Sequence, residues 1–435
     1  MSGTLGPNAP PQFPAGLVGD VAQFIFEAAP RPVREIALVG ALGFIAGLVG
    51  RSFNISNAGL NLYLLLIAET GMGKEAIASG TSKLVKAVHS VSPTILDFVG
   101  PTEFASSQGL IKWLVRNPCI YSIVGEFGLK FKEVSSNNAP AHLASQRRLL
   151  LDLYHKSGHG NVLGAMAYAN RENNTSAISS PSFTLIGEST PSKFFENVTE
   201  DVVSDGLLPR FGIYQFNGPL QPFNERHAEV VPNPILVDKI AALAAQCHSI
   251  GALGQVQNVG LNADAKAHLD AFRRDCDHKI NDTSTLRPYE RELWNRAHLK
   301  ALKLAALYAV GVNYTHPWVD SEQARTACED IQRQTQTLIA KFSNNEVGGI
   351  AGNEARQLRE VQRAIGIYLS TPFKKKKKYG GTEKMHRDHI ISASHIQRRL
   401  VNTAAFRVPG GATRAINERL RQKLEADELR EVRRD

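Results

Sequence analysis

A glycine and lysine pattern suited to binding phosphate lies near the start of the chain. The preceding segment, Leu62–Ile67, is apolar throughout, which predicts a strand buried on both faces of a parallel sheet. Gly71 and Gly73 allow the backbone N–H groups to point at phosphate oxygens, and Lys74 adds a positive charge where the next helix begins. We therefore predict a nucleotide-binding loop; the alternative is a glycine-rich turn that binds nothing. Its residues are Ala68, Thr70, Gly71, Met72, Gly73, Lys74 and Glu75.

Two positions around this loop depart from the usual pattern of a hydrolase. Glu75 stands where a Ser or Thr hydroxyl normally holds Mg²⁺. After the second apolar strand, Cys119–Val124, Gly125 stands where an acid normally supports the metal, and Glu126 follows where a carboxylate activates water. We predict that Glu126 is the catalytic base and that Glu75 supplies the missing metal-binding carboxylate. The alternatives are a surface glutamate at 126 and a site that binds nucleotide without turnover.

Further polar side chains follow the third strand. The strand Phe183–Gly187 ends at Glu188-Ser189-Thr190, and Ser189 and Thr190 lie where a hydroxyl can contact the γ-phosphate. Arg210 lies in a compact Leu-Leu-Pro-Arg-Phe turn, and an arginine there can reach the γ-phosphate of a neighbouring subunit as an arginine finger. Arg296, on a predicted helix, is a candidate for a second phosphate contact. For both arginines, an ordinary surface charge is the alternative.

Composition describes an ordinary globular protein. The 435 residues are 43% hydrophobic and 21% charged, enough chain for two or three domains. The apolar run Glu35–Gly50 is too short to span a bilayer, and no cationic leader precedes it, so we expect a buried helix. The cysteines are too widely separated for a disulfide framework or a zinc knuckle, which favours a cytoplasmic protein. They are Cys119, Cys247, Cys276 and Cys328.

Positive charge is concentrated at the C-terminal end. The net charge is +9, and residues 355–435 hold 20 Lys and Arg against 9 Asp and Glu. The last eighty or so residues therefore suggest a separate module that meets a polyanion.

Strands alternate with helices around the loop, which predicts an α/β core with a parallel sheet. The segment 161–180 alternates in character and is predicted to be a hairpin that turns near residue 173. Four long helical patterns follow, and they predict an all-α lid. The expected domains are a disordered segment 1–16, helices within 17–58, the ATPase core 59–221, the lid 222–343, a linker 344–353 and a basic domain 354–435.

These motifs together resemble an AAA+ ATPase of the ring-helicase branch. The Leu-Leu-Pro-Arg-Phe turn at Arg210 is similar to the finger motif of MCM helicases, and the hairpin occupies the insertion that superfamily 3 and MCM-type helicases use to grip DNA. The stretch Gly187–Pro191 also resembles a motif of a phage and plasmid family of helicase-like proteins, often found beside primases. The resemblance covers about residues 35–340 and implies ATP, Mg²⁺ and a ring, most often a hexamer. It also implies that the hairpin tip, with Arg171, Asn173 and Asn174, faces DNA in the central channel.

The basic C-terminal segment has the element order of a winged helix, a relative of the helix-turn-helix. Helices are predicted over 354–369, 392–401 and 411–426, with a short closing strand at 429–432. The third helix carries four basic residues suited to contact with DNA, and a lysine run between Phe373 and Tyr379 adds a basic loop. A solvated, disordered loop is the alternative for the run. The basic residues are Lys374, Lys375, Lys376, Lys377, Lys378, Arg414, Arg419, Arg421 and Lys423.

The sequence thus predicts a ring-shaped, ATP-dependent DNA helicase or translocase that acts in the replication of a phage or plasmid. The competing hypothesis is a replication initiator or helicase loader that binds ATP and DNA with little or no hydrolysis. A P-loop protein that acts on small molecules is disfavoured by the finger turn and the basic segment.

Overall fold

A computed structural model covers the whole chain. It describes all residues except 1–11, 137–138, 168–171, 173, 196–197, 199–201, 204, 283–286, 344–348, 374–381, 407–410, 426–428, 430–431 and 433–435. The chain forms two compact units, Met1–Ala340 and Lys341–Asp435.

The first unit is built on a parallel sheet of four strands in the order β4-β7-β3-β8. These strands are β3 (Tyr63–Ala68), β4 (Cys119–Val124), β7 (Ser182–Ser189) and β8 (Phe211–Phe216). All six residues of β3 are buried, as the apolar run predicted, because strands lie on both sides of it and helices cover its faces. The prediction of an α/β core with a parallel sheet is confirmed. The strand β8 was not predicted.

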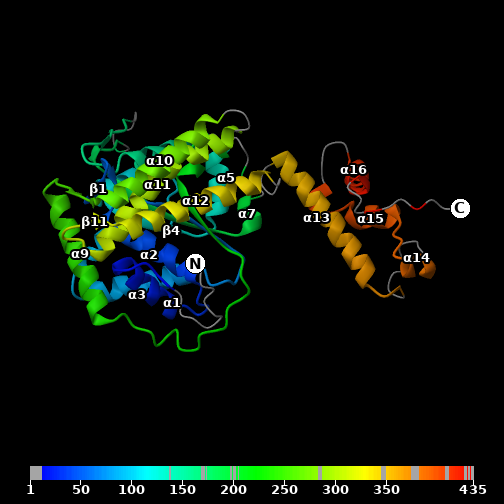
Figure 1. Ribbon diagram of the computed structural model, residues 1–435, viewed down its shortest axis with the longest axis horizontal. Coiled ribbons are helices and arrows are strands. Elements are labelled where there is room, and N and C mark those ends of the chain that lie inside the picture. The colour runs from blue at the N-terminus through cyan, green and yellow to red at the C-terminus, as the bar shows by residue number, and fades with distance from the viewer. Residues whose placement is uncertain are drawn as a thin grey trace. The chain divides into compact units, whose positions relative to one another are not determined.

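One face of the sheet carries α2 (Arg34–Val49), which is buried almost all round, as expected of a helix that is apolar on every side. Gly43 and Gly47 allow it to lie close to the strands, because a Cβ at these positions would come within 2.2 Å of Ile186 and 2.5 Å of Tyr121. Figure 1 shows α1 (Leu17–Glu27), α2 and α3 (Ala76–His89) gathered in the same part of this unit. The Glu35–Gly50 run is therefore a core helix, and no described helix is long and apolar enough to cross a membrane.

The opposite face of the sheet packs against α5 (Phe127–Ser135) and α6 (Ala141–His155). A Cβ at Gly187 would lie 2.5 Å from the ring of Phe127, and the Tyr63 hydroxyl donates to the Leu150 carbonyl oxygen at 2.7 Å. Because β-strand side chains alternate between faces, residues 185, 187 and 189 face α5 and α6, whereas 186 and 188 face α2.

The remaining elements of the first unit are mostly helices and short strand pairs. The longer helices are α4 (Ser107–Arg116), α9 (Pro234–Ala252), α10 (Ala263–Asn281), α11 (Pro288–Val312) and α12 (Ser321–Ser343). The short helices are η1 (Pro93–Phe98), α7 (Pro191–Phe195) and η3 (Leu208–Arg210). The short strands are β1 (Phe53–Ile55), β2 (Ala58–Gly59), β5 (Val162–Leu163), β6 (Ile178–Ser179), β9 (Gln257–Asn258), β10 (Gly260–Leu261) and β11 (Trp318–Val319). One core joins the N-terminal helices, the sheet and the helices of the expected lid.

The second unit is helical. It comprises α13 (Gly349–Ser370), α14 (Glu383–Arg387), α15 (Ala393–Leu400), η6 (Ala404–Phe406) and α16 (Ala412–Glu425). The three longer helices α13, α15 and α16 enclose a small apolar core that includes Val361, Ile396, Phe406 and Ile416. The first helix begins at 349, so the expected linker to 353 was too long. Of the expected closing strand, Leu429 and Val432 are described and neither is in a strand.

Candidate functional site

The glycine loop joins the end of β3 to the start of α3, at the carboxyl edge of the sheet. Gly71 and Gly73 have φ angles of +81° and +87°, a backbone conformation that L side chains rarely adopt. A Cβ at Gly73 would also lie 2.7 Å from the Arg31 carbonyl oxygen. Glu75 precedes α3 without capping it by a side-chain hydrogen bond, and its side chain is exposed. The positive end of α3 is thus free of a side-chain cap next to the loop.

Lys74 is folded back over this loop. Its Nζ atom donates to the carbonyl oxygens of Ala68 at 2.6 Å and Glu69 at 3.0 Å. Burial lowers the pKa of Lys74, and nearby carboxylates oppose that effect, Glu188 most strongly. The ammonium group therefore lies among acceptors that a phosphate could replace. Thr70 is exposed and Met72 half-buried in the same loop.

Glu126 directly follows β4 through Gly125, as the sequence indicated. Its backbone is left-handed, with a φ of +52°, and its carboxylate forms an ion pair with Lys193 of α7. The Glu126 side chain is 64% exposed, so it can be reached by a ligand at the loop. Glu126 contributes to the electrostatic surroundings of Lys74, which places the expected base near the expected phosphate site.

Glu188 is the residue that reasoning from the sequence missed. It is half-buried in β7, between the loop strand β3 and the Glu126 strand β4. Burial raises the pKa of Glu188 to about 7; the Lys74 charge opposes this rise, while Glu75 and Glu126 add to it. The available signal was a lone carboxylate near the end of an otherwise uncharged, mostly buried strand, but only the strand order brings it beside Lys74.

Ser189 and Thr190 are buried and make local contacts. The Ser189 hydroxyl donates to the Thr190 carbonyl oxygen at 3.3 Å, and a Cβ at Gly128 of α5 would come within 2.1 Å of the Ser189 Oγ. The Thr190 hydroxyl accepts a long hydrogen bond, 3.5 Å, from the Lys193 backbone N–H at the start of α7. Ser189 therefore faces α5, whereas Glu188 faces the side of the sheet that carries α2.

Arg210 lies at the opposite edge of the sheet from Lys74, because it ends η3 just before β8 begins. Its side chain is buried: one Nη donates to the Gly206 carbonyl oxygen, and the other lies 2.6 Å from His155 Nε2. Since arginine only donates, His155 must be neutral and accept. This agrees with a His155 pKa that burial and the charges of Arg210, Arg296 and Lys303 lower to about 4. The adjoining turn is held by an ion pair between Asp205 and Arg147.

Arg296, on α11, lies with Arg210. Burial lowers the pKa of Arg210, and the charge of Arg296 lowers it further. Among the described side chains, no carboxylate is within ion-pair distance of either arginine. The structure therefore brings together the two arginines that the sequence suggested for phosphate contact, but it places them away from Lys74 of the same chain.

The predicted hairpin is present at its base. The strands β5 and β6 pair antiparallel, and the Thr175 N–H donates to the Met166 carbonyl oxygen further along. Asn174 is exposed. Arg171 and Asn173, which the resemblance placed at a DNA-binding tip, lie outside the described residues.

The second unit exposes part of the basic surface that was expected. Arg414 and Arg421 of α16 are exposed, whereas Arg419 and Lys423 are only 4% and 5% exposed. The prediction that Arg419 and Lys423 are suited to DNA contact is therefore wrong, because they lie on the side of α16 that packs inward. The lysine run 374–378 lies outside the described residues.

A second basic pair in this unit was missed by the sequence reasoning. Arg398 and Arg399 are exposed on α15, and Gln397 beside them donates to Asn417 of α16 at 2.6 Å. This hydrogen bond joins the two helices. The exposed arginines of α15 and α16 therefore lie on two helices that are in contact.

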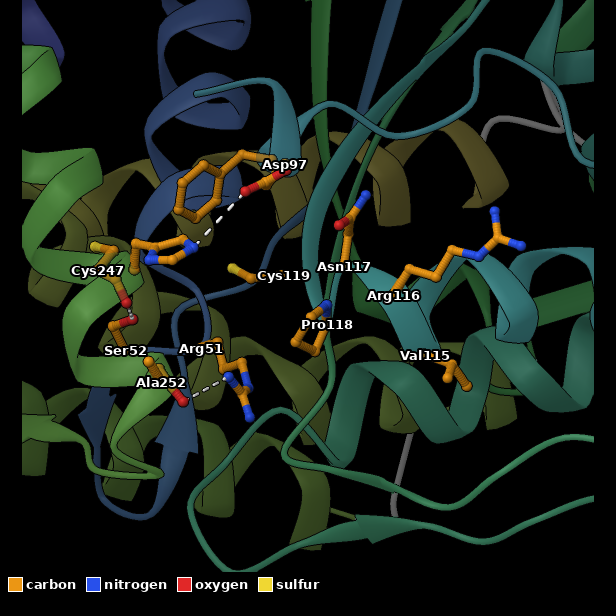
Figure 2. A pocket seen from close by; sticks show the side chains of 13 residues that line it. Arg51, Ser52, Asp97, Val115, Arg116, Asn117, Pro118, Cys119, Cys247 and Ala252 are labelled. Carbon is orange, nitrogen blue, oxygen red and sulfur yellow. Dashed lines mark hydrogen bonds and ion pairs between the residues drawn. The ribbon is translucent and has the colours of Figure 1, made fainter. Parts of the chain in front are cut away.

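A separate cavity of about 340 Å³ lies at the amino edge of the sheet, where β4 begins (Figure 2). Arg51 enters it and donates to the Gly251 carbonyl oxygen at 3.2 Å, while His248 pairs with Asp97 at 3.7 Å. The C-terminal ends of α2, α4 and α9 meet here, so Arg51 has the role of a cation near helix carbonyl groups. This cavity is distinct from the glycine loop, which lies at the other edge of the sheet.

Comparisons with known proteins do not assign this chain to a family. The chain matches no family model and no curated protein. Among solved structures, it is similar to a full-length MCM homologue from Methanopyrus kandleri, with a TM-score of 0.35 and 12% sequence identity. The match covers 75% of this chain and 63% of that protein, so the chain spans less than two thirds of its length.

Proposed function

We propose that this protein is an ATP-driven DNA translocase or helicase of the AAA+ type, which works as a ring, most simply a hexamer, in phage or plasmid replication. The observation that carries the proposal is the separation of its phosphate-binding charges. Lys74 lies at the carboxyl edge of the sheet, and Arg210 lies at the amino edge without a carboxylate partner among the described residues.

Because they lie at opposite edges of the sheet, Lys74 and Arg210 of one chain cannot both contact the same bound nucleotide. The strands β3 and β8 pair in parallel from Tyr63 with Phe211 to Ala68 with Phe216, a span of about 17 Å at 3.3 Å per residue. A triphosphate held at Lys74 therefore leaves Arg210 of its own chain unused. A second copy that brings its amino edge to this loop would supply Arg210, and Arg296 beside it, to the γ-phosphate.

The chemistry then divides between two subunits. Lys74 and the backbone of the glycine loop bind the phosphates, and Glu126 orients the attacking water. Lys193 holds the Glu126 carboxylate in the absence of substrate. Bound Mg²⁺ would neutralise charge on the phosphates, with Glu75 as the ligand suggested by sequence and Glu188 as an alternative ligand. Arg210 must leave His155 before it can reach a neighbour, because the imidazole occupies one of its Nη groups.

DNA contact is proposed at two places. The hairpin based on β5 and β6 carries the exposed Asn174, and it is the candidate for single strands in the channel. The second unit supplies Arg414 and Arg421 on α16 and the lysine run 374–378, which suit the phosphates of duplex DNA.

The test is ATPase activity of the full chain with and without single-stranded DNA. We expect Mg²⁺-dependent turnover that DNA stimulates, and loss of turnover in Lys74→Ala and in Arg210→Ala. A mixture of the two variants should regain part of the activity, because some interfaces then combine an intact Lys74 with an intact Arg210. Arg226→Ala is the matched control, since Arg226 is 84% exposed and its ion pair is with Glu229, three residues further along the chain.

The second candidate is an initiator or loader that binds ATP without appreciable turnover. It is favoured by Gly125, which offers no acid to the metal, and by the ion pair that engages Glu126. Under this hypothesis the wild-type protein assembles on DNA in the presence of ATP but shows no hydrolysis above that of Lys74→Ala. That result would refute the proposal of an ATP-driven translocase, while the proposal of a nucleotide-binding site at Lys74 would stand.

A further inference from the structure

The strand register places Glu188 at the same level in the sheet as Gly125, where hydrolases of this type usually have an acidic residue. In β7, Glu188 pairs with Leu66 of β3 on one side, and on the other side Gly187 pairs with Val124 of β4. Continued by one residue, this register brings Gly125 opposite Glu188. Neighbouring strands are about 4.8 Å apart, and residues in register point to the same face. A carboxylate at 188 therefore begins one strand spacing from where a carboxylate at 125 would begin, on the side nearer the phosphate loop.

The orientation of Glu188 also suits a ligand at the loop. It shares a face with Ile186, which meets α2, and α3 packs against α2. Of the four carboxylates that oppose the effect of burial on Lys74, Glu188 acts most strongly and Glu75 least. A Cβ at Gly125 would meet nothing within 4 Å, so the space that an aspartate would occupy there is open to a longer side chain from the next strand.

We propose that Glu188 replaces the acid missing at 125 and holds the Mg²⁺ that accompanies the triphosphate, an inference that rests on the proposed function. Within the described part of the chain, the Glu188 carboxylate has no hydrogen bond or ion pair. A half-buried carboxylate beside bound phosphates would repel them unless a cation lies between.

The donor set fits magnesium. Among the described residues, no group of three or more His, Cys, Asp or Glu could hold a metal by itself. Mg²⁺ is commonly held by one or two carboxylates together with substrate phosphates and water, so one well-placed glutamate is sufficient. Glu75 is the less suitable donor, because it precedes α3 with an exposed side chain and acts on Lys74 less strongly than Glu188 does.

The experiment measures binding of a fluorescent, non-hydrolysable ATP analogue to the full chain, once in excess Mg²⁺ and once in EDTA. For Glu188→Gln we expect binding in Mg²⁺ to weaken by at least roughly tenfold, because loss even of a group that only orients a metal ligand costs that much in metal affinity. In EDTA we expect unchanged or tighter binding, because a negative charge near the phosphates has been removed. Loss of the free Mn²⁺ signal in electron paramagnetic resonance, with the analogue present, reports metal binding directly.

Two further variants separate this role from others, beside a matched control, Glu329→Gln, whose carboxylate is 61% exposed on α12 and which should bind as the wild type does in both conditions. Glu75→Gln removes the competing ligand and should keep the wild-type dependence of binding on Mg²⁺. Gly125→Asp, added to Glu188→Gln, should restore the Mg²⁺ dependence, because it returns a carboxylate to the adjacent strand at the same level.

The outcomes are distinct. A wild-type protein that binds no analogue in either condition refutes the proposed function, and this inference with it. Equal wild-type binding in Mg²⁺ and EDTA leaves the nucleotide site standing and overturns the inference. Loss of Mg²⁺ dependence in Glu75→Gln, or equal weakening of Glu188→Gln binding in both conditions, also overturns it, since the first assigns the metal to Glu75 and the second indicates a structural role.

Discussion

The buried lysine Lys303 should make the stability of the first unit depend on pH. Lys303 lies on α11, fully buried, and its Nζ donates to Asn61 Oδ1 at 2.7 Å and lies 4.2 Å from the centre of the Tyr154 ring. Burial lowers the pKa of Lys303 from 10.5 to about 7. Asn61 comes just before the loop strand β3, so this lysine ties α11 to the amino end of that strand.

The direction in which the free energy of unfolding changes with pH follows from the protons bound by the folded and unfolded chains. Between the folded pKa of about 7 and the unfolded pKa of 10.5, the unfolded chain holds a proton at Lys303 that the folded chain has largely released. The free energy of unfolding therefore rises with pH across this window and falls as pH drops toward 7. At 1.36 kcal/mol for each pH unit, the contribution amounts to about 2 kcal/mol between pH 7.5 and 9.

Lys303→Met should remove that contribution while it fills a similar volume. We expect the free energy of unfolding to rise less with pH in the variant than in the wild type, by about 2 kcal/mol over this interval. A smaller slope should persist from Lys300, whose pKa burial lowers to about 8. Urea unfolding followed by tryptophan fluorescence is suitable, since all three tryptophans lie in the first unit.

The surface lysine Lys266, 66% exposed, supplies the control: Lys266→Met should keep the wild-type pH dependence. Equal pH slopes for the wild type and Lys303→Met would refute the reasoning, because they would mean that Lys303 keeps its proton equally well in the folded and unfolded chain.

Three other predictions concern the loop, the core and the proposed DNA-binding surface. Gly73→Ala should abolish binding of the ATP analogue while circular dichroism stays unchanged, because its φ of +87° and the nearby Arg31 carbonyl oxygen exclude a Cβ; retained affinity would contradict this. Gly47→Ala should cost about 1–3 kcal/mol in urea unfolding, because the new Cβ lies 2.5 Å from Tyr121 in a packed interface; an unchanged midpoint would contradict it. Arg414→Ala should weaken duplex DNA binding and reduce its salt slope by about one, whereas Arg419→Ala should instead lower the stability of the second unit; the reverse result would place the DNA surface on the other side of α16.

Much of the core could be predicted because its signals are local. The apolar run before Ala68 and the strand Cys119–Val124 are recognisable from their residue types alone, and both are present. The strand β8 could not be recognised as easily. Phe211–Phe216 mixes buried and half-buried residues, and it directly follows the Arg210 turn, whose sequence is typical of a loop.

The second unit illustrates a different limit. The positions of α15 and α16 were close to those predicted, yet the helical pattern could not say which side of α16 packs inward. Ala415, Arg419 and Lys423 are spaced four residues apart, so they share one side of the helix, and in the folded unit that side is buried. Burial of long basic side chains along an apolar contact requires the neighbouring helices to be in place.

By itself, the sequence determined the glycine loop, since the φ angles of Gly71 and Gly73 and the charge of Lys74 are properties of adjacent residues. Only the tertiary structure decided what surrounds that loop. Strand order and register depend on pairing between segments more than a hundred residues apart, and they bring Glu188 level with Gly125 beside Lys74. The same parallel pairing sends Arg210 to the opposite edge, which turns one chain's arginine into a candidate partner for another chain's nucleotide.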